Sequence, residues 1–215
     1  MFGVIYDANV LVPASLTDTL VRTASSGLCT AHWSQDILDE VYRTLRRRGM
    51  DESKARRRIA VMAAIPSVTM VSGYEDLIPV MKCDEKDRHV QAAAVCAKLE
   101  AIITYNLKDF PTAALQPYDL RAISPDEFLH DCLKIDATVM SSLIDAQAKA
   151  LHAPTMTAED VLERLSHHVP TFTKALRSFR AKHAIVPFPG AMVEDATPKA
   201  STIRRRTRRA PRDIS

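Results

Sequence analysis

Short apolar segments alternate with longer helical patterns over the first 133 residues, and this alternation limits the fold more than any other feature. Two of the apolar segments are GVIY at 3–6 and the β-branched SVTMVSG at 67–73. The other strand candidates are 28–33, 101–104 and 119–124. Strands that are separated by helices predict one parallel sheet covered by helices on both faces, so we expect an α/β domain over residues 1–133.

The β signal disappears after this domain. Residues 136–151 and 157–181 have helical patterns, the second interrupted at Pro170, so we expect a small all-helical extension over residues 134–183. Residues 184–215 begin with a Pro-rich linker and end in a basic tail. The tail, residues 199–215, contains Lys199 and six arginines but only one acid, Asp213. Such a tail is typical either of a solvated terminus or of a segment that binds a polyanion.

Composition excludes several classes of protein. Hydrophobic residues make up 47% of the chain and charged residues 26%, which predicts a folded protein with an ordinary core. No apolar run is long enough to cross a membrane and no signal peptide is visible, so we expect a cytoplasmic protein without a membrane partner. Four irregularly spaced cysteines predict reduced thiols, and five glycines without a G-x-G-x-x-G motif argue against dinucleotide binding.

Acidic residues recur where the predicted strands end. Asp7 follows the first strand, Asn106 and Asp109 follow the strand at 101–104, and Asp87 begins the helix that leads into that strand. Glu40 lies on the helix after the second strand, on the side that carries its apolar residues. Ligands of open parallel sheets bind at the carboxyl edge of the strands, so we expect these side chains to converge there.

Carboxylates that converge repel one another and need a cation between them. A cluster of acids without nearby His or Cys favours Mg²⁺ or Mn²⁺ over zinc. Taken singly, each acid also has a structural interpretation. Asp7 could form a turn, Glu40 could be solvated, Asp84 and Asp87 could complement a helix dipole, and Asp109 could cap a helix.

The helices after the second strand carry many basic residues. They could form a track for a nucleic-acid backbone or simply a solvated surface. The candidates for RNA binding are Arg46, Arg47, Arg48, Arg56 and Arg57, with Lys54 and Arg58 on the same segment.

Four motifs in this order resemble the PIN-domain family of metal-dependent ribonucleases, which includes VapC toxins. They are DANVL at 7–11, SQDILDEVYRTL at 34–45, KDRHVQAAA at 86–94 and ITYNLKDFP at 103–111. The resemblance covers residues 1–133 and implies a three-layer α/β/α domain that cleaves RNA with Mg²⁺ or Mn²⁺. The helical extension resembles that of longer, toxin-like members.

The resemblance also implies roles for particular residues. Asp7 and Asp87 correspond to metal ligands, Glu40 to a direct or water-mediated ligand, and Asn9 to the residue that supports Asp7. Some members carry an acid where this chain has Asn106, so Asp109 is the candidate for the fourth catalytic position. Asp84, Thr104 and Asn106 are expected to support the site.

The resulting hypothesis is a metal-dependent endoribonuclease, the toxin of a VapBC-type pair, with RNA as substrate and an antitoxin as partner. We expect it to form a homodimer or a hetero-oligomer with the antitoxin. An alternative is a catalytically weak PIN-like module that binds RNA. A phosphatase with Asp7 as nucleophile is disfavoured, because Asn9 stands where that class carries a second Asp. A further hypothesis is that the tail at 204–209 folds back onto the acidic site and inhibits it.

Overall fold

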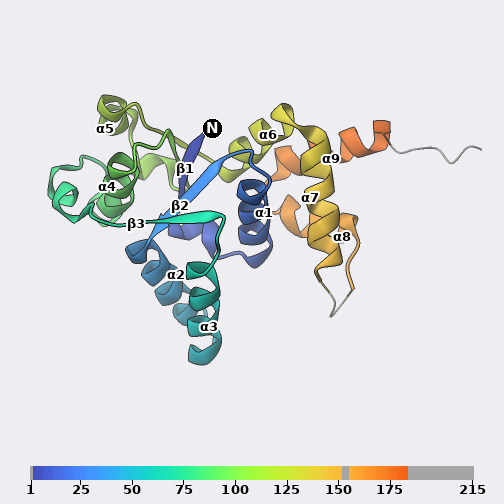
Figure 1. The fold of residues 1–215 in the computed structure, drawn as a ribbon, viewed down its shortest axis with the longest axis horizontal. Coiled ribbons are helices and arrows are strands. Elements are labelled where there is room, and N and C mark those ends of the chain that lie inside the picture. Colours follow the sequence, from blue (N-terminus) through green and yellow to red (C-terminus); the bar gives the residue numbers. More distant parts are fainter. Residues whose placement is uncertain (1, 152–154, 184–215) are drawn as a thin grey trace, which may run out of the picture. The chain divides into compact units, whose positions relative to one another are not determined.

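The computed structural model describes residues 2–151 and 155–183 (Figure 1). The predicted linker, the basic tail and its inhibitory contact lie outside these residues. Residues up to His183 form one compact unit. Among the described residues, no helix is long and apolar enough to cross a membrane.

A parallel sheet of five strands forms the centre of the described chain, in the order β3-β2-β1-β4-β5. Its strands are β1 (Gly3–Tyr6), β2 (Thr30–Ser34), β3 (Val68–Val71), β4 (Ala101–Ile103) and β5 (Arg121–Ile123). Val4 pairs with Ala31 of β2 on one side and with Ala101 of β4 on the other. The chain adds β2 and β3 on one side of β1 and then β4 and β5 on the other, so the strand order reverses beside β1.

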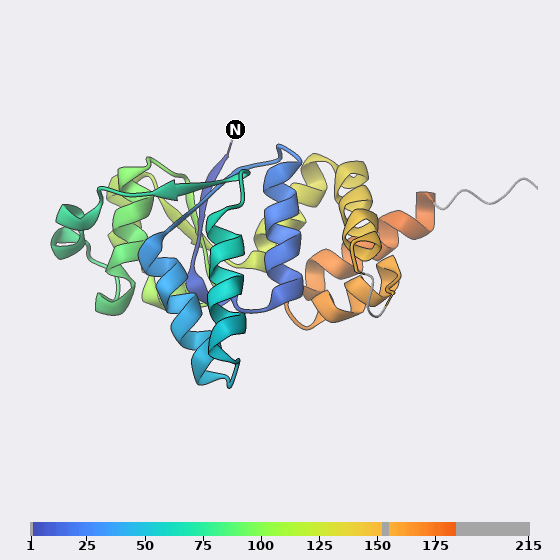
Figure 2. The same cartoon turned by 60° about the horizontal axis from the view of Figure 1, so that its bottom comes forward.

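All five predicted strands are present, with boundaries shifted by at most two residues. Helices cover both faces of the sheet, as the sequence predicts, and the two views show α4 on one side and α1 on the other (Figures 1 and 2). The helices are α1 (Ala14–Ser25), α2 (Gln35–Arg47), α3 (Glu52–Ala63), α4 (Arg88–Cys96), α5 (Thr112–Leu115), α6 (Pro125–Ile135), α7 (Ala137–Lys149), α8 (Ala158–Ser166) and α9 (Pro170–His183). Short 3-10 turns lie at η1 (Ala8–Leu11), η2 (Glu75–Val80), η3 (Glu85–Asp87), η4 (Leu107–Asp109) and η5 (Gln116–Tyr118).

Local sequence explains where α2 begins and how it packs. The Ser34 hydroxyl accepts a hydrogen bond from the Ile37 amide, at 3.3 Å, and so caps the first turn. Ile37, Leu38, Val41 and Leu45 are buried on one face. Gly49 has a positive φ of 84°, which a side chain would disfavour, and turns the chain into α3.

The C-terminal helices α6–α9 pack on the α1 side of the domain (Figure 2). The amide of Gln147 in α7 joins the two parts: its Oε1 accepts from Thr19 Oγ1 at 2.8 Å, and its Nε2 donates to Ser15 O at 2.9 Å. Phe128 of α6 meets the ring of Tyr6 edge to face, with centroids 6.2 Å apart. The expected domain boundary at residue 133 lies inside α6. The break at Pro170 is confirmed, because α9 begins there.

All four cysteines are free thiols, in agreement with their irregular spacing.

Candidate functional site

Asp7 lies at the point where the strand order reverses. It follows the last residue of β1, and its amide donates to Ile103 O at the end of β4, at 3.0 Å. Its side chain is only 2% exposed. In an open parallel sheet this crevice, between two strands whose connections run in opposite directions, is the usual ligand site. The fold therefore places the first predicted acid where a ligand is expected.

A hydrogen-bond network fixes the Asp7 carboxylate. Thr104 Oγ1 donates to Asp7 Oδ2 at 2.6 Å, and Asn9 Nδ2 donates to the same oxygen at 2.6 Å. Asn9 also bonds Thr104 Oγ1 at 3.0 Å and accepts from the Tyr105 amide at 3.1 Å. The Asn106 amide completes the network by donating to Thr104 Oγ1 at 3.0 Å. Oδ2 is thus fully engaged, which leaves Oδ1 without a side-chain partner among the described residues.

Asp87 and Asp109 come from two 3-10 turns that are joined by their backbones. The Asp84 amide donates to Asp109 O at 2.9 Å, and the Asp87 amide donates to Asp84 O at 3.0 Å. Asp87 is 4% exposed and Asp109 is 9% exposed. The Asp84 side chain is exposed and accepts from the Lys86 amide, so it shapes the turn rather than facing the site. Asn106 likewise contributes its backbone: its amide donates to Thr104 Oγ1 and its carbonyl accepts from the Asp109 amide.

Glu40 of α2 is half-buried, and its Oε2 lies 3.6 Å from Nε2 of His89 in α4. The neighbouring Asp39 is exposed and accepts from Gln35 Nε2 at 2.8 Å, away from the site. Of these two acids, Glu40 is therefore the one that faces α4.

Neighbouring acids of the site influence the pKa values of Asp7 and Asp87. Burial has the largest effect on Asp7 and raises its pKa to about 6; the Thr104 hydrogen bond opposes this increase and the Glu40 charge adds to it. The pKa of Asp87 rises to about 7, chiefly through burial and then through Asp7, with Lys86 opposing and further contributions from Asp109 and Glu40. The pKa of Glu40 is lowered, first by the neighbouring imidazole of His89. The acids are therefore close enough to form one electrostatic unit.

Lys86 partly neutralises this unit. Its Nζ lies 3.1 Å from Asp109 Oδ2 and 3.9 Å from Asp87 Oδ2. Over residues 2–151 and 155–183, no three His, Cys, Asp or Glu side chains stand in a ready-made metal-binding group.

The residues nevertheless fit a hard divalent cation. Asp87 Oδ2 is buried and has no hydrogen-bond partner among the described residues, which is costly unless a ligand pairs with it. The surrounding donors are carboxylate oxygens, the ligands that Mg²⁺ and Mn²⁺ prefer. Asp7 and Asp87 are the most buried of the four acids and would hold the cation, with Asp109 and Glu40 beside them.

Replacing Lys86 with Gln should strengthen Mg²⁺ binding by about three- to tenfold, because a competing positive charge near the acids is removed. Without metal, the variant should melt below the wild type, since Asp87 and Asp109 lose their counter-charge. Thermal unfolding during a Mg²⁺ titration measures both effects. Lys82→Gln removes an exposed charge from the same loop and should change neither; equal shifts in the two variants would contradict the role of Lys86.

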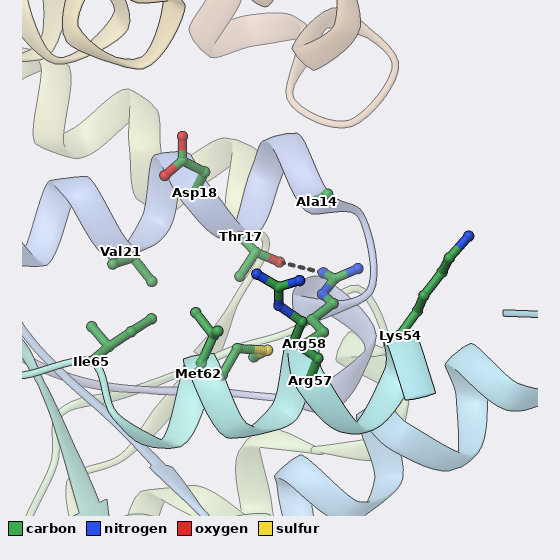
Figure 3. A pocket seen from close by; sticks show the side chains of 10 residues that line it. Ala14, Thr17, Asp18, Val21, Lys54, Arg57, Arg58, Met62 and Ile65 are labelled. Atoms are coloured by element: carbon green, nitrogen blue, oxygen red, sulfur yellow. Dashed lines mark hydrogen bonds between the residues drawn. The ribbon is translucent and has the colours of Figure 1, made fainter. Parts of the chain in front are cut away.

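The predicted RNA-binding arginines do not share one face. Arg46 and Arg47 border a hollow of about 640 Å³ beside α2. Arg56 is paired with Glu52 at 2.7 Å and lies over the Tyr42 ring. Arg57 instead lines a separate groove of about 410 Å³ between α1 and α3, which has an apolar floor (Figure 3). Arg48 is exposed at the end of α2.

Sequence reasoning missed three residues near the acids. Lys86 and His89 flank Asp87 in KDRH, and their closeness to that acid was the available signal. Arg43 lies three residues after Glu40, a spacing that places two side chains on the same face of a helix. Its charge helps to lower the pKa of Glu40.

A three-layer α/β/α domain with buried acids beside the central strand of its sheet is the arrangement expected of PIN domains. The PIN domain family model matches residues 3–108, so this part of the chain has the sequence of a PIN domain. The model of the VapC50 C-terminal domain matches residues 125–178, which hold most of α6–α9. The expected PIN-type fold with a helical C-terminal extension is therefore confirmed.

Within the PIN domains, one curated relative indicates similarity to VapC-like proteins. The chain is 44% identical over 108 residues to "Putative ribonuclease VapC50" of Mycobacterium tuberculosis (strain ATCC 25618 / H37Rv). The match covers 50% of this chain and 64% of the relative, so the chain spans less than two thirds of the relative's length. No solved structure matches the chain.

Proposed function

We propose that this protein is a metal-dependent endoribonuclease that hydrolyses RNA phosphodiester bonds. The observation that carries the proposal is the set of four mutually interacting acids at the point where the strand order reverses. The PIN domain match and the name of the mycobacterial relative support it.

The residues of the site have separate roles in hydrolysis. A bound Mg²⁺ or Mn²⁺ supplies Lewis-acid polarisation of the phosphate and lowers the pKa of water. Asp7 and Asp87 would hold the cation, while Asn9 and Thr104 keep the Asp7 carboxylate in place. Glu40 is ionised at neutral pH, since its surroundings lower its pKa further below its ordinary value. Attack of water on phosphorus breaks the bond to O3′, which takes up a proton, and leaves a 5′-phosphate and a 3′-hydroxyl.

The test is cleavage of single-stranded and structured RNA by the full chain in Mg²⁺ or Mn²⁺, with EDTA as control. We expect cleavage that EDTA abolishes. RNA binding without cleavage in either metal would instead favour the alternative, a catalytically weak RNA-binding module. The ammonium of Lys86 between Asp87 and Asp109 is the observation that gives this alternative weight.

Thr104→Val should lower cleavage by about ten- to hundredfold, because it removes the hydroxyl that donates to Asp7 and accepts from Asn9. The loss corresponds to about 1–3 kcal/mol for an unsatisfied buried polar group. Thr104→Ser keeps the hydroxyl and should stay within about threefold of the wild type. Cleavage rates of a labelled RNA, together with unfolding curves for each variant, test this prediction. A Val variant with wild-type activity would show that Thr104 has no role in the site.

We further propose that the protein acts as the toxin of a VapBC-type pair and is restrained by an antitoxin, in a homodimer or a hetero-oligomer. The VapC50-type C-terminal domain supports this assignment. Co-expression with a small protein encoded beside it, followed by a mass measurement of the complex, is the test. A partner that binds without reducing RNA cleavage would contradict it.

A further inference from the structure

Several arginines of α2 have no carboxylate partner. In the described part of the chain, Arg22, Arg56, Arg177 and Arg180 each form an ion pair with an acid. Arg43, Arg46 and Arg47 form none within the same residues. All three are exposed. Their charges are therefore available to an anion from outside the domain.

Two of these arginines lead away from the acidic site along one face of α2. Arg43 and Arg47 follow Glu40 by one and two helical turns, or about 4.5 and 10.5 Å along the axis. Arg47 Nη2 donates to Thr44 Oγ1 at 3.0 Å, which directs the guanidinium back towards Glu40. Both charges act on the Glu40 carboxylate. Arg46 differs, because its Nη1 donates to Met50 O at 2.6 Å and so stabilises the end of the helix.

The surface beside these side chains is hollowed. A depression of about 640 Å³ is lined by Tyr42, Arg43, Arg46, Arg47 and Glu52. The lining contains three guanidinium groups and only one acid, Glu52, which already forms an ion pair with Arg56. A guanidinium can bind two oxygens of one phosphate at once, so this lining suits a phosphodiester backbone.

We propose that Arg43 and Arg47 bind the phosphates of the RNA strand next to the bond that is cleaved. This inference rests on the proposed nuclease function and identifies where its substrate lies. Four carboxylates repel a polyanion, so a substrate needs positive charge close to them. Arg43 and Arg47 supply that charge on the helix that also carries Glu40.

The groove between α1 and α3 provides a matched control (Figure 3). Lys54 and Arg57 border it and are exposed, as Arg43 and Arg47 are. Val21, Met62 and Ile65 make its floor apolar. Removing two charges there changes the net charge of the protein equally but leaves the α2 face intact.

The experiment measures binding of a fluorescein-labelled single-stranded RNA in EDTA, over about 50–200 mM salt. Arg43→Gln/Arg47→Gln should weaken binding by about tenfold or more and reduce the slope of log affinity against log salt by about 0.7 for each phosphate that is no longer bound. Lys54→Gln/Arg57→Gln should change affinity by less than about twofold. Both double variants should unfold at the wild-type temperature, since their side chains are exposed.

Equal losses of affinity in both double variants would mean that only net charge matters and would overturn the assignment. A larger loss from Lys54→Gln/Arg57→Gln would place the RNA in the α1–α3 groove and would overturn it too, as would a wild-type chain that binds no RNA. Binding that depends on Arg43 and Arg47 without any cleavage in Mg²⁺ or Mn²⁺ would leave this inference standing and remove the nuclease. Cleavage that is unchanged when both arginines are replaced would overturn this inference and leave the nuclease function standing.

Discussion

Asp7→Asn should reduce Mg²⁺-dependent RNA cleavage by about 10³-fold or more, which corresponds to about 4 kcal/mol of transition-state stabilisation. The substitution keeps the size of the side chain and an oxygen that can accept from Asn9 and Thr104. It removes the charge that a divalent cation needs at the most buried acid of the site. Cleavage rates of a labelled RNA in excess Mg²⁺, for the wild type and the variant, measure the effect.

The same variant makes a prediction about stability that separates lost catalysis from lost folding. Asn at this position no longer repels Glu40 and Asp87, whose charges interact with Asp7 in the wild type. In EDTA we therefore expect the variant to melt at or above the wild-type temperature. Asp39→Asn is the matched control, because Asp39 is exposed and points away from the site. Full cleavage by Asp7→Asn, or loss of cleavage only because it unfolds, would reject Asp7 as a metal ligand.

Much of the fold could be predicted because its determinants are local and periodic. The strand segments are apolar and short, and α2 shows its cap, its apolar face and its glycine stop in the sequence. Once a parallel sheet is assumed, the carboxyl ends of its strands meet at one edge, so the convergence of Asp7 with the residues after β4 follows from topology. The positions of Asp87 and Glu40 could be predicted from the direction of the helical segments that carry them.

The contacts that tune the site could not be predicted in the same way. Lys86 contacts Asp109, which lies 23 residues later in the sequence, and His89 of α4 contacts Glu40 of α2. Both contacts depend on side-chain directions that no local sequence pattern encodes. The arrangement of the arginines could not be predicted for a similar reason. Consecutive residues of a helix point in different directions, and α3 turns Arg57 towards α1, while Arg47 lies on α2 two turns after Glu40.

The raised pKa values of Asp7 and Asp87 predict that the metal-free protein loses stability as pH rises. An ordinary Asp has a pKa near 3.8, whereas in the folded chain these two titrate near 6 and 7. Between about pH 4 and pH 7 the folded state therefore binds more protons than the unfolded state, and each rise in pH disfavours folding. For Asp7 alone the loss is about 3 kcal/mol in the free energy of unfolding. Asp109 and Glu40 also repel the ionised pair, and Lys86 opposes them.

A divalent cation should reverse this loss, because it binds the ionised carboxylates and displaces their protons. The rise in melting temperature on adding Mg²⁺ should thus be large at pH 8 and small at pH 5. Denaturant unfolding from pH 4 to pH 8, with EDTA or Mg²⁺, measures both trends for the wild type and for Asp7→Asn/Asp87→Asn. The double variant cannot ionise at these positions, so its EDTA curve should be flatter and its response to Mg²⁺ should vanish at every pH. Parallel curves for the two proteins would mean that the pKa values of these acids are not raised in the folded state and that the acids do not hold a cation.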